Sequence, residues 1–169
     1  MAKAPDLAMN SQLQNCININ ASLEALEYFK GIDIDRFADF FTLKKLFAGD
    51  ILFREGDHAD SIAFIVSGRL EVKKQTEFPG KYFVLSILGK GSFIGEKAII
   101  GKGPTIKGPM LRTATATALE ETCLAVLKKD AFEEMLKRSP DIAAVLLRAL
   151  LYEISSRLNG ANGRMAAVF

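Results

Sequence analysis

The sequence predicts a mainly β domain flanked by helices. Between residues 43 and 127, short apolar stretches of strand length alternate with turns that contain Gly, Asp or Pro. Such closely spaced strands are typical of a β-sandwich, jelly roll or barrel. No helix-length segment separates them, which disfavours a parallel α/β architecture. The chain has 169 residues, 49% hydrophobic and 25% charged, which suits one ordinary globular domain.

The N-terminal part is predicted to contain a leader and two short helices. Residues 1–21 carry Asn, Gln and Ser without a sustained apolar period, and we expect a loose leader there. Ser22 suits the N-cap of the first helix, which Gly31 interrupts. The apolar residues that recur at helical spacing are Leu23, Leu26 and Phe29 in the first helix, then Ile34, Phe37 and Phe40/Phe41 in the second.

The β region is divided by turns. The expected strands are 43–47, 51–53, 62–66, 70–72, 82–88, 111–119 and 122–127. Glycines fall between many of these stretches, at positions 49, 56, 68, 80, 89 and 91. Glycine is favoured there because a tight turn or a positive φ is costly for other residues.

Two helices are predicted after the strands. The first covers residues 130–138. Ser139-Pro140-Asp141 is a favourable start for the second, with Ser as N-cap, Pro at the first helical position and an acid in the first turn. This helix is expected to run to about Leu158, where Asn159-Gly160 would stop it.

The predicted domain spans residues 22–158 and is followed by a short tail at 159–169. The apolar residues of its last helix cover more than one face, because Leu147 and Leu151 lie beside the main stripe. One helix buries one stripe against its own domain. The surplus favours a homodimer through helix 140–158 over a helix wedged in a broad groove of its own sheet.

Composition excludes several classes of partner. The net charge of +2 gives no excess for a nucleic-acid or membrane partner. The short tail leaves no room for a DNA-binding helix-turn-helix, so no DNA partner is expected. No apolar run approaches the ~18–20 residues of a membrane span and no signal sequence is recognised, so we expect a cytoplasmic protein.

Histidine and cysteine are scarce. The single histidine, His58, lies in a polar stretch and is expected to be a solvated loop residue. One imidazole is too few for the usual zinc or metal-oxygenase sites, and we predict no catalytic residue, no metal site and no catalytic cofactor. Cys16 and Cys123 cannot form a disulfide framework and are expected to be free, inert thiols.

One constellation carries chemistry. Gly95-Glu96 opens a short apolar segment that fits one helical turn, whose unpaired N–H groups suit a phosphate. Arg112 supplies a forked guanidinium for phosphate oxygens, Glu96 supplies acceptors for sugar hydroxyls, and the small Ala114 lets a ligand approach. This combination indicates a nucleotide site. The alternative is a turn glycine, a surface ion pair and a Thr/Ala-rich edge strand.

Three blocks of sequence occur in order: residues 48–57 (AGDILFREGD), residues 61–72 (SIAFIVSGRLEV), and residues 93–98 (FIGEKA) with 112–115 (RTAT). They resemble the cyclic-nucleotide-binding domains of the catabolite activator protein, protein kinase A regulatory subunits and cyclic-nucleotide-gated channels. The resemblance extends from about Leu23 to Leu158. It implies a double-stranded β-helix, a jelly-roll-like β-roll with N-terminal helices and a long C-terminal helix.

The resemblance implies a cAMP or cGMP ligand. Glu96 would hold the ribose 2′-hydroxyl, and Arg112 would pair with the cyclic phosphate, helped by backbone groups nearby. Thr113 stands where some relatives contact the guanine of cGMP, but cAMP binders also carry Ser or Thr there, so the base stays open. The helix from Pro140 would cover the base. The predicted ligand-binding residues are Phe93, Gly95, Glu96, Lys97, Ala98, Arg112, Thr113 and Ala114.

The chain departs from the family pattern in two places. Glu96 and Arg112 are 16 positions apart, more than relatives usually need. The extra residues, within 101–110, are rich in Gly and Pro and are expected to form a surface loop near the ligand mouth. Lys97 replaces the usual apolar residue and is expected to point to solvent, the alternative being added attraction for phosphate.

Two functions from different classes follow. The first is a regulatory module that binds a cyclic nucleotide and signals, through movement of its C-terminal helix, to its dimer mate or a separate effector protein. The second is a ligand-free structural, interaction or dimerisation module that retains the β-roll. An enzyme is not expected, because the segment offers neither a suitable general base nor a cluster of metal-binding carboxylates.

Overall fold

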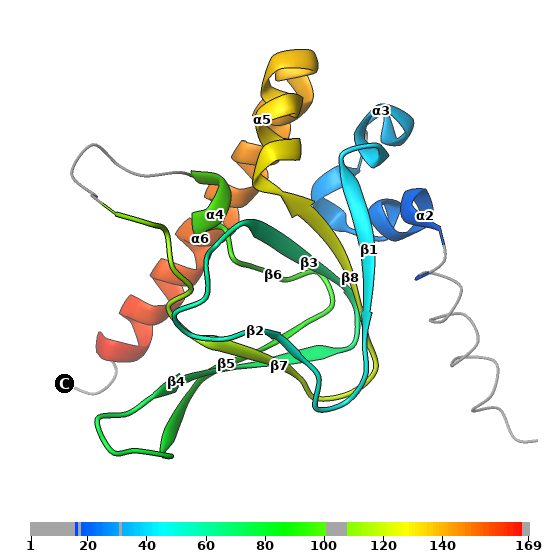
Figure 1. Ribbon diagram of the computed structural model, residues 1–169. Helices are drawn as coiled ribbons and strands as arrows, with labels where there is room; N and C mark the ends of the chain where they lie inside the picture. The colour runs from blue at the N-terminus through cyan, green and yellow to red at the C-terminus, as the bar shows by residue number, and fades with distance from the viewer. Residues whose placement is uncertain (1–15, 17, 31, 101–107, 167–169) are drawn as a thin grey trace, which may run out of the picture.

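The computed structural model describes residues 16, 18–30, 32–100 and 108–166, with side chains described as far as Asn159. Helices, strands and helices follow one another along the chain (Figure 1). The helices are α2 (Ile19–Glu24), the 3₁₀ helix η1 (Glu27–Phe29), α3 (Ile34–Ala38), α4 (Lys97–Ile100), α5 (Lys129–Arg138) and α6 (Pro140–Ala166). The strands are β1 (Phe41–Leu46), β2 (Ile51–Phe53), β3 (Ser61–Ser67), β4 (Arg69–Gln75), β5 (Tyr82–Gly89), β6 (Phe93–Ile94), β7 (Thr115–Ala118) and β8 (Thr122–Lys128).

The described strands form two four-stranded sheets that face each other as a β-roll (Figure 1). The strand orders are β1-β8-β3-β6 and β2-β7-β4-β5, and the neighbouring strands pair antiparallel. The N-terminal helices, α5 and α6 lie on the outer side of the first sheet (Figure 1). The predicted fold class, a jelly-roll-like β-roll with flanking helices, is confirmed.

Strand β3 separates two apolar cores. Ala63 and Ile65 face the inner core between the sheets, whereas Ile62, Phe64 and Val66 face the outer core beneath the helices. All five side chains are at most 4% exposed. Because both faces of the strand are covered, its sequence is a continuous apolar run rather than an alternation. Full burial of each large side chain contributes roughly 1.5–3 kcal/mol.

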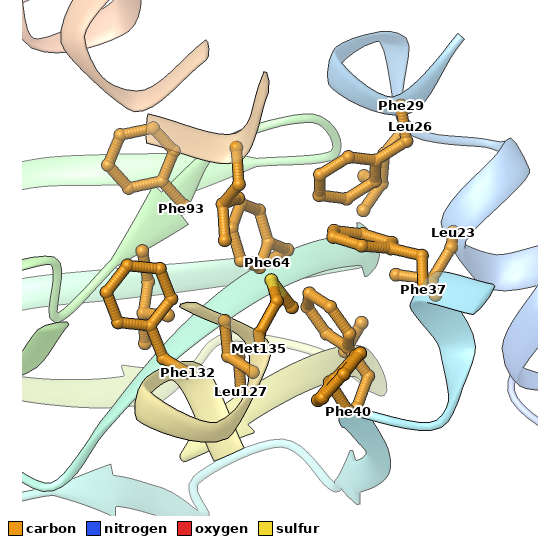
Figure 2. Close-up of a cluster of buried hydrophobic side chains, with 14 of the residues drawn as sticks. Leu23, Leu26, Phe29, Phe37, Phe40, Phe64, Phe93, Leu127, Phe132 and Met135 are labelled. Carbon is orange, nitrogen blue, oxygen red and sulfur yellow. The ribbon is translucent and has the colours of Figure 1, made fainter. Parts of the chain in front are cut away.

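Aromatic rings join the N-terminal helices to the sheet. Figure 2 shows Phe29, Phe37 and Phe93 grouped around Phe64 of β3. The ring centroids of Phe29 and Phe64 lie 5.4 Å apart, and those of Phe64 and Phe93 lie 5.8 Å apart, in edge-to-face and tilted arrangements. Such pairs stabilise beyond their buried area. They fix η1, α3 and β6 on the same face of the sheet.

The first helix begins earlier than the sequence predicts. Asn18, not Ser22, caps α2: its side-chain oxygen accepts hydrogen bonds from the N–H groups of Asn20 at 2.9 Å and Ala21 at 3.3 Å. Ser22 lies inside the helix and is buried, and its Oγ donates to the carbonyl of Asn18 at 2.8 Å. The N-cap prediction was wrong because Asn caps as well as Ser and stands four residues earlier. Before Asn18, Cys16 is the one residue of the predicted leader among the described residues.

The C-terminal ends of two predicted helices also differ from the structure. The second N-terminal helix stops at Ala38, and Phe41 belongs to β1 instead. Helix α6 begins at Pro140 as predicted but continues through Asn159-Gly160 to Ala166, so the predicted stop was wrong. A glycine inside a helix costs about 1 kcal/mol relative to alanine, and it ends a helix only where the chain turns away.

The two cysteines are bonded, which corrects the expectation of free thiols. A disulfide joins Cys16 to Cys123 of β8 across a sequence separation of 107, with Cα atoms 5.6 Å apart. Cys123 faces the outer core, where the segment before α2 folds back onto the sheet. Two cysteines are too few for a framework, but one pair needs only proximity in the fold. Spacing along the chain carries no information about that proximity.

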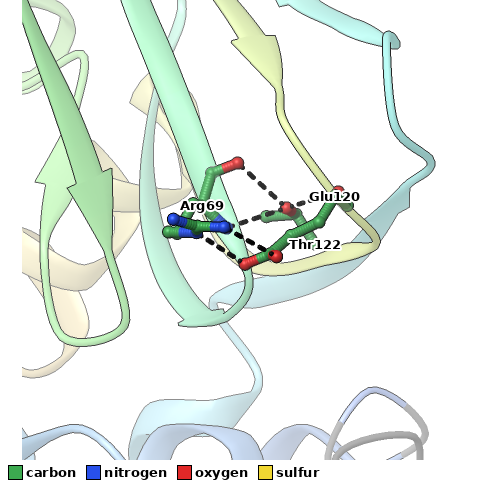
Figure 3. A network of polar contacts seen from close by, with 3 residues as sticks. All are labelled: Arg69, Glu120 and Thr122. Atoms are coloured by element: carbon green, nitrogen blue, oxygen red, sulfur yellow. Dashed lines mark hydrogen bonds and ion pairs between the residues drawn. The ribbon is translucent and has the colours of Figure 1, made fainter.

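The turn between β3 and β4 packs closely on the start of β8. Thr122 is fully buried, and its Oγ1 accepts a hydrogen bond from the N–H of Arg69 at 3.2 Å and donates to the carbonyl of Glu120 at 2.9 Å. The Arg69 guanidinium donates two hydrogen bonds to the Glu120 carboxylate, of 2.9 and 3.2 Å (Figure 3). Gly68 stands directly against this network, and its φ is +82°.

Replacing Gly68 by alanine should lower the free energy of unfolding by about 3 kcal/mol. A Cβ at this position would lie 2.7 Å from the Cα of Thr122 and against its Oγ1, and the backbone conformation is itself strained for alanine. Gly80 is the matched control, because its φ is +76° but nothing lies within 4 Å of its Cβ direction. Gly80→Ala should cost only about 1 kcal/mol in urea unfolding. Equal losses for the two variants would contradict the close packing at Gly68.

Candidate functional site

A cavity of about 580 Å³ opens between the second sheet, the β6–α4 segment and helix α6. Its apolar wall comes from β4 and β5 and includes Val72, Leu85 and Leu88. Its polar groups come from four parts of the chain: β5, the β6–α4 segment with the residue before it, the residues before β7, and α6. An apolar pocket with a few converging polar groups is the usual form of a small-molecule site.

Gly95 sits at the turn between β6 and α4. Its φ is +89°, which favours glycine, and a Cβ there would lie 2.7 Å from the carbonyl oxygen of Ser61 and against the Arg112 guanidinium. The missing side chain therefore makes the space that Arg112 occupies. Glu96 follows directly and lines the cavity.

Arg112 is held in place by an irregular segment. The predicted strand 111–119 is shorter than expected: β7 begins only at Thr115, and Leu111 makes an isolated bridge with His58. The N–H of Arg112 donates to the carbonyl of Asp57 at 2.8 Å, and its carbonyl accepts from the N–H of Gly56 at 2.9 Å. The backbone of Arg112 is thus fixed by the loop between β2 and β3.

The Arg112 side chain is 7% exposed and only partly paired. Nη1 donates to the Ser61 carbonyl at 2.8 Å, and Nη2 donates to Ser61 Oγ at 3.1 Å and to Asp60 Oδ1 at 3.4 Å. The guanidinium carbon lies 4.1 Å from the centroid of the Phe53 ring. Its Nε is buried and has no hydrogen-bond partner among the described residues. The Nε–H of this buried cation is therefore an unsatisfied donor among the described residues.

Burial and neighbouring charges have opposite effects on the pKa of Arg112. Burial lowers the pKa of the Arg112 guanidinium, whereas the carboxylates of Asp60, Asp57 and Glu96 raise it. Arginine stays charged at neutral pH despite such a shift. The site thus holds a desolvated cation with an acidic group nearby at Glu96. This pairing suits a ligand that carries both an anion and hydroxyl groups.

The structure brings most of the predicted site residues together. The predicted residues that line the cavity are Gly95, Glu96, Lys97, Arg112, Thr113 and Ala114. Phe93 and Ala98 do not line it: Phe93 is fully buried in the outer core, and the N–H of Ala98 donates to the carbonyl of Gly95 at 3.0 Å. Lys97 is exposed at the rim. Of the predicted loop 101–110, residues 101–107 lie outside the described residues.

Helix α6 adds polar groups that the sequence did not predict: Glu153, Ser156 and Arg157 also line the cavity. Arg157 Nε lies 3.1 Å from Glu153 Oε1, its Nη2 donates to the carbonyl of Phe93 at 3.0 Å, and its guanidinium carbon stacks 4.5 Å from the Phe93 ring centroid. The only sequence signal was a Glu–Arg pair four residues apart, which is common on exposed helices. Arg157 thereby ties α6 to β6, the strand that leads into Gly95 and Glu96.

Tyr28 of η1 lies at the same junction. Its ring packs edge-on against Phe93, with centroids 6.1 Å apart. Burial raises the pKa of the Tyr28 hydroxyl, and the nearby Glu153 carboxylate raises it further while Arg157 opposes the shift. The N-terminal helices, α6 and β6 therefore meet at the edge of the cavity.

The described part of the chain holds neither a metal-binding cluster nor a membrane-spanning helix. No group of three or more His, Cys, Asp or Glu side chains is placed there to hold a metal ion. No helix within it has the length and apolar character needed to cross a membrane. His58 is exposed in the loop before β3, as its sequence context predicts.

Known proteins are similar to this chain in sequence and in fold. A family model described as "Cyclic nucleotide-binding domain" matches residues 43–139. The CRP-like cAMP-activated global transcriptional regulator of Mycobacterium tuberculosis (strain CDC 1551 / Oshkosh) is 29% identical over 118 residues, which are 70% of this chain and 47% of that protein. The chain thus spans about half the length of this relative.

Two solved structures extend the match. The N-terminal domain of a transcriptional regulator from Streptomyces coelicolor A3(2) superposes with a TM-score of 0.61 at 28% identity, covering 84% of this chain and 95% of that one. A cyclic nucleotide-binding domain from Methylobacillus flagellatus kt superposes with a TM-score of 0.71 at 22% identity, covering 92% and 85%. The matched family region contains both Glu96 and Arg112. This chain belongs to the cyclic nucleotide-binding domain family.

Proposed function

We propose that this chain is a regulatory module that binds cAMP or cGMP in the 580 Å³ cavity. One observation carries the proposal: Arg112 is buried in the cavity wall, and its Nε has no partner among the described residues, while Glu96 lines the same cavity. A cyclic phosphate supplies the missing acceptor. The relative in Mycobacterium tuberculosis is described as cAMP-activated, which agrees with this ligand class.

Arg112 would hold the phosphate. A guanidinium offers several N–H donors in one plane, and phosphate oxygens accept them in pairs. The Ser61 and Asp60 contacts already fix Nη1 and Nη2, so the phosphate would meet a preorganised cation rather than a mobile one. Preorganisation reduces the entropy lost on binding. Lys97 at the rim would add only weak, solvent-screened attraction.

Glu96 and the apolar wall would hold the nucleoside. The Glu96 carboxylate accepts hydrogen bonds from the ribose hydroxyl, while the small Ala114 leaves room for the sugar beside the backbone. Val72, Leu85 and Leu88 offer an apolar surface to the base, and Glu153 and Arg157 of α6 stand on the same cavity. The choice between adenine and guanine depends on these groups and on Thr113.

Signalling would pass through α6. This helix forms one wall of the cavity and is joined to β6 by Arg157. A ligand that contacts both walls favours one placement of the helix over another, which is all that a population shift requires. We propose that the module acts by binding rather than by catalysis, that it works in the cytoplasm, and that α6 transmits the change to a dimer mate or a separate effector protein.

The proposed homodimer uses the outer face of α6. This face carries exposed apolar side chains, among them Val145, Leu151 and Tyr152, which are 37, 68 and 76% exposed. The same three residues line a groove with Tyr28. An equivalent helix from a second copy would cover this surface with a self-complementary contact.

A second function is favoured by one feature of the site. The Arg112 guanidinium is hydrogen-bonded to Ser61 and Asp60 of the protein itself. These contacts hold β3 to the segment before β7 and thus have a structural use. A ligand-free interaction or dimerisation module that retains the β-roll accounts for them equally well.

Titration of the full chain with cAMP and with cGMP separates the two functions. Ligand at a hundred times its Kd stabilises the folded state by about 2.7 kcal/mol, which for this size raises the Tm by roughly 5–10 °C. We expect such a rise with at least one nucleotide. The matched control is 5′-AMP, which has the same base and sugar but lacks the phosphate ring. No shift with either cyclic nucleotide at millimolar concentration would reject the sensor and favour the ligand-free module.

A further inference from the structure

The Cys16–Cys123 disulfide lies at the boundary between the β-roll and the first helices. Cys123 is the second residue of β8, opposite Lys45 on β1 and Ser67 on β3, and is only 3% exposed. Cys16 is half-buried and precedes the N-cap of α2 by two residues. One sulfur therefore belongs to the core, while the other lies nearer the surface.

The bond holds a segment that has little stability of its own. Helix α2 has six residues and η1 has three, far fewer than an isolated helix needs in water. Besides the bond, the segment is held by Leu23, Leu26 and Phe29, which are buried in the outer core, and by Ile19 and Tyr28, which pack against that core. The rest of the fold has its own support, because the inner core and the strands of both sheets contain no residue of this segment. Loss of the bond therefore affects residues 16–29 first.

We propose that Cys16 and Cys123 form a reversible redox tether, which fixes residues 16–29 on β8 when oxidised and lets them detach when reduced. Disulfides that replace a missing core occur in small domains, whereas this chain builds two apolar cores. In compartments rich in thiol reductants, disulfides are usually transient or redox-sensing. A single bond at the edge of a self-sufficient core fits this second use.

The chemistry is thiol–disulfide exchange with a thiol such as glutathione. A thiolate of one molecule attacks Sγ of Cys16, the bond between the cysteines breaks, and its electron pair leaves on Sγ of Cys123, which takes up a proton. A second thiolate then attacks the sulfur of the first molecule and displaces Cys16, which takes up a proton, so that two protein thiols and one disulfide of the two reductant molecules remain. A thiolate at Cys123 is poorly solvated in the core. Its release is therefore coupled to lifting of the segment that covers it.

Detachment of this segment would change contacts at the edge of the cavity. Tyr28 belongs to the tethered segment, and its ring packs on Phe93, whose carbonyl accepts the hydrogen bond from Arg157 of α6. Release of the segment removes Tyr28 from this junction and leaves α6 held by fewer contacts. The tether rests on the proposed cytoplasmic location, and an effect on nucleotide affinity rests in addition on the proposed ligand.

The test uses the full chain, purified without reductant and equilibrated in mixtures of reduced and oxidised glutathione under native conditions. Acid quenching, alkylation and mass spectrometry count the free thiols at each ratio. We expect the bond to be intact in oxidising mixtures, to open in reducing ones and to re-form on return. Opening should lower the Tm by about 10 °C, because the bond closes a loop of more than a hundred residues. It should also speed tryptic cleavage after the exposed Lys30 at least tenfold.

Cys16→Ser provides the control, since it removes the bond without altering the buried core position. It should match the reduced wild type in Tm and cleavage rate and should not respond to glutathione. The tether is rejected if both thiols are free at every ratio, or if the bond opens only in denaturant. It is equally rejected if the bond opens while Tm and cleavage stay unchanged. Nucleotide titration is scored separately, so failure of either proposal is recognised on its own.

Discussion

Under the proposed function, replacing Arg112 by alanine should lower the affinity for cAMP or cGMP at least a hundredfold and abolish the rise in Tm expected from the nucleotide. Truncating one partner of a buried, hydrogen-bonded charge pair typically costs 2–5 kcal/mol or more, which corresponds to about two orders of magnitude in Kd or beyond. Arg112 is 7% exposed and supplies the buried Nε that has no partner among the described residues. Isothermal titration calorimetry on wild type and variant measures the change directly.

Two further variants separate binding from folding. Alanine at position 112 leaves the Ser61 carbonyl without one of its hydrogen bonds and so also destabilises the fold. Arg112→Lys keeps the charge but lacks the planar fork, and it should lose at least tenfold in affinity. Lys97→Ala removes an exposed charge at the rim of the same cavity and should change Kd less than threefold. If Lys97→Ala weakened binding as much as Arg112→Ala, the phosphate would have to be placed at the rim instead.

Replacing Phe64 by alanine should lower the free energy of unfolding by about 4 kcal/mol. The side chain is fully buried, and its ring lies 5.4–6.4 Å from those of Phe29, Phe93, Phe41 and Tyr28. Truncation would leave a cavity where η1 meets β1, β3 and β6. Urea unfolding followed by circular dichroism gives the midpoint and slope from which the loss is obtained.

Phe83 is the matched control for this loss. It is also a strand phenylalanine, but it lies on β5 and is 64% exposed. Phe83→Ala should change the free energy of unfolding by less than about 1 kcal/mol. Similar losses for the two substitutions would show that the outer core is not organised around Phe64.

The parts of the fold predicted from sequence are those in which local pattern and environment agree. The continuous apolar run at 62–66 is a strand because both of its faces are covered. Pro140 starts α6 because a missing N–H and a fixed φ suit the first helical turn. The motif residues Glu96 and Arg112 share a cavity because β6 and the segment before β7 lie close together in the roll.

The parts not predicted depend on contacts between distant segments. The Cys16–Cys123 bond and the Arg157–Phe93 hydrogen bond each join residues far apart in sequence, so spacing and periodicity contain no trace of them. The pairing of Arg112 with Ser61 is of the same kind. The late end of α6 is a different case. The low helix propensity of Asn159-Gly160 costs little free energy, and the rest of the helix outweighs it.

The empty space at Gly95 has an evolutionary consequence. Because the Arg112 guanidinium occupies the position of a Cβ at residue 95, any side chain there must displace it. A first mutation at Gly95 displaces Arg112, whereas loss of Arg112 leaves glycine required by its φ of +89° and by the Ser61 carbonyl oxygen, 2.7 Å from the Cβ position. The dependence is therefore one-sided: a lineage can lose Arg112 and still be held to Gly95, but it cannot change Gly95 and keep Arg112 in place.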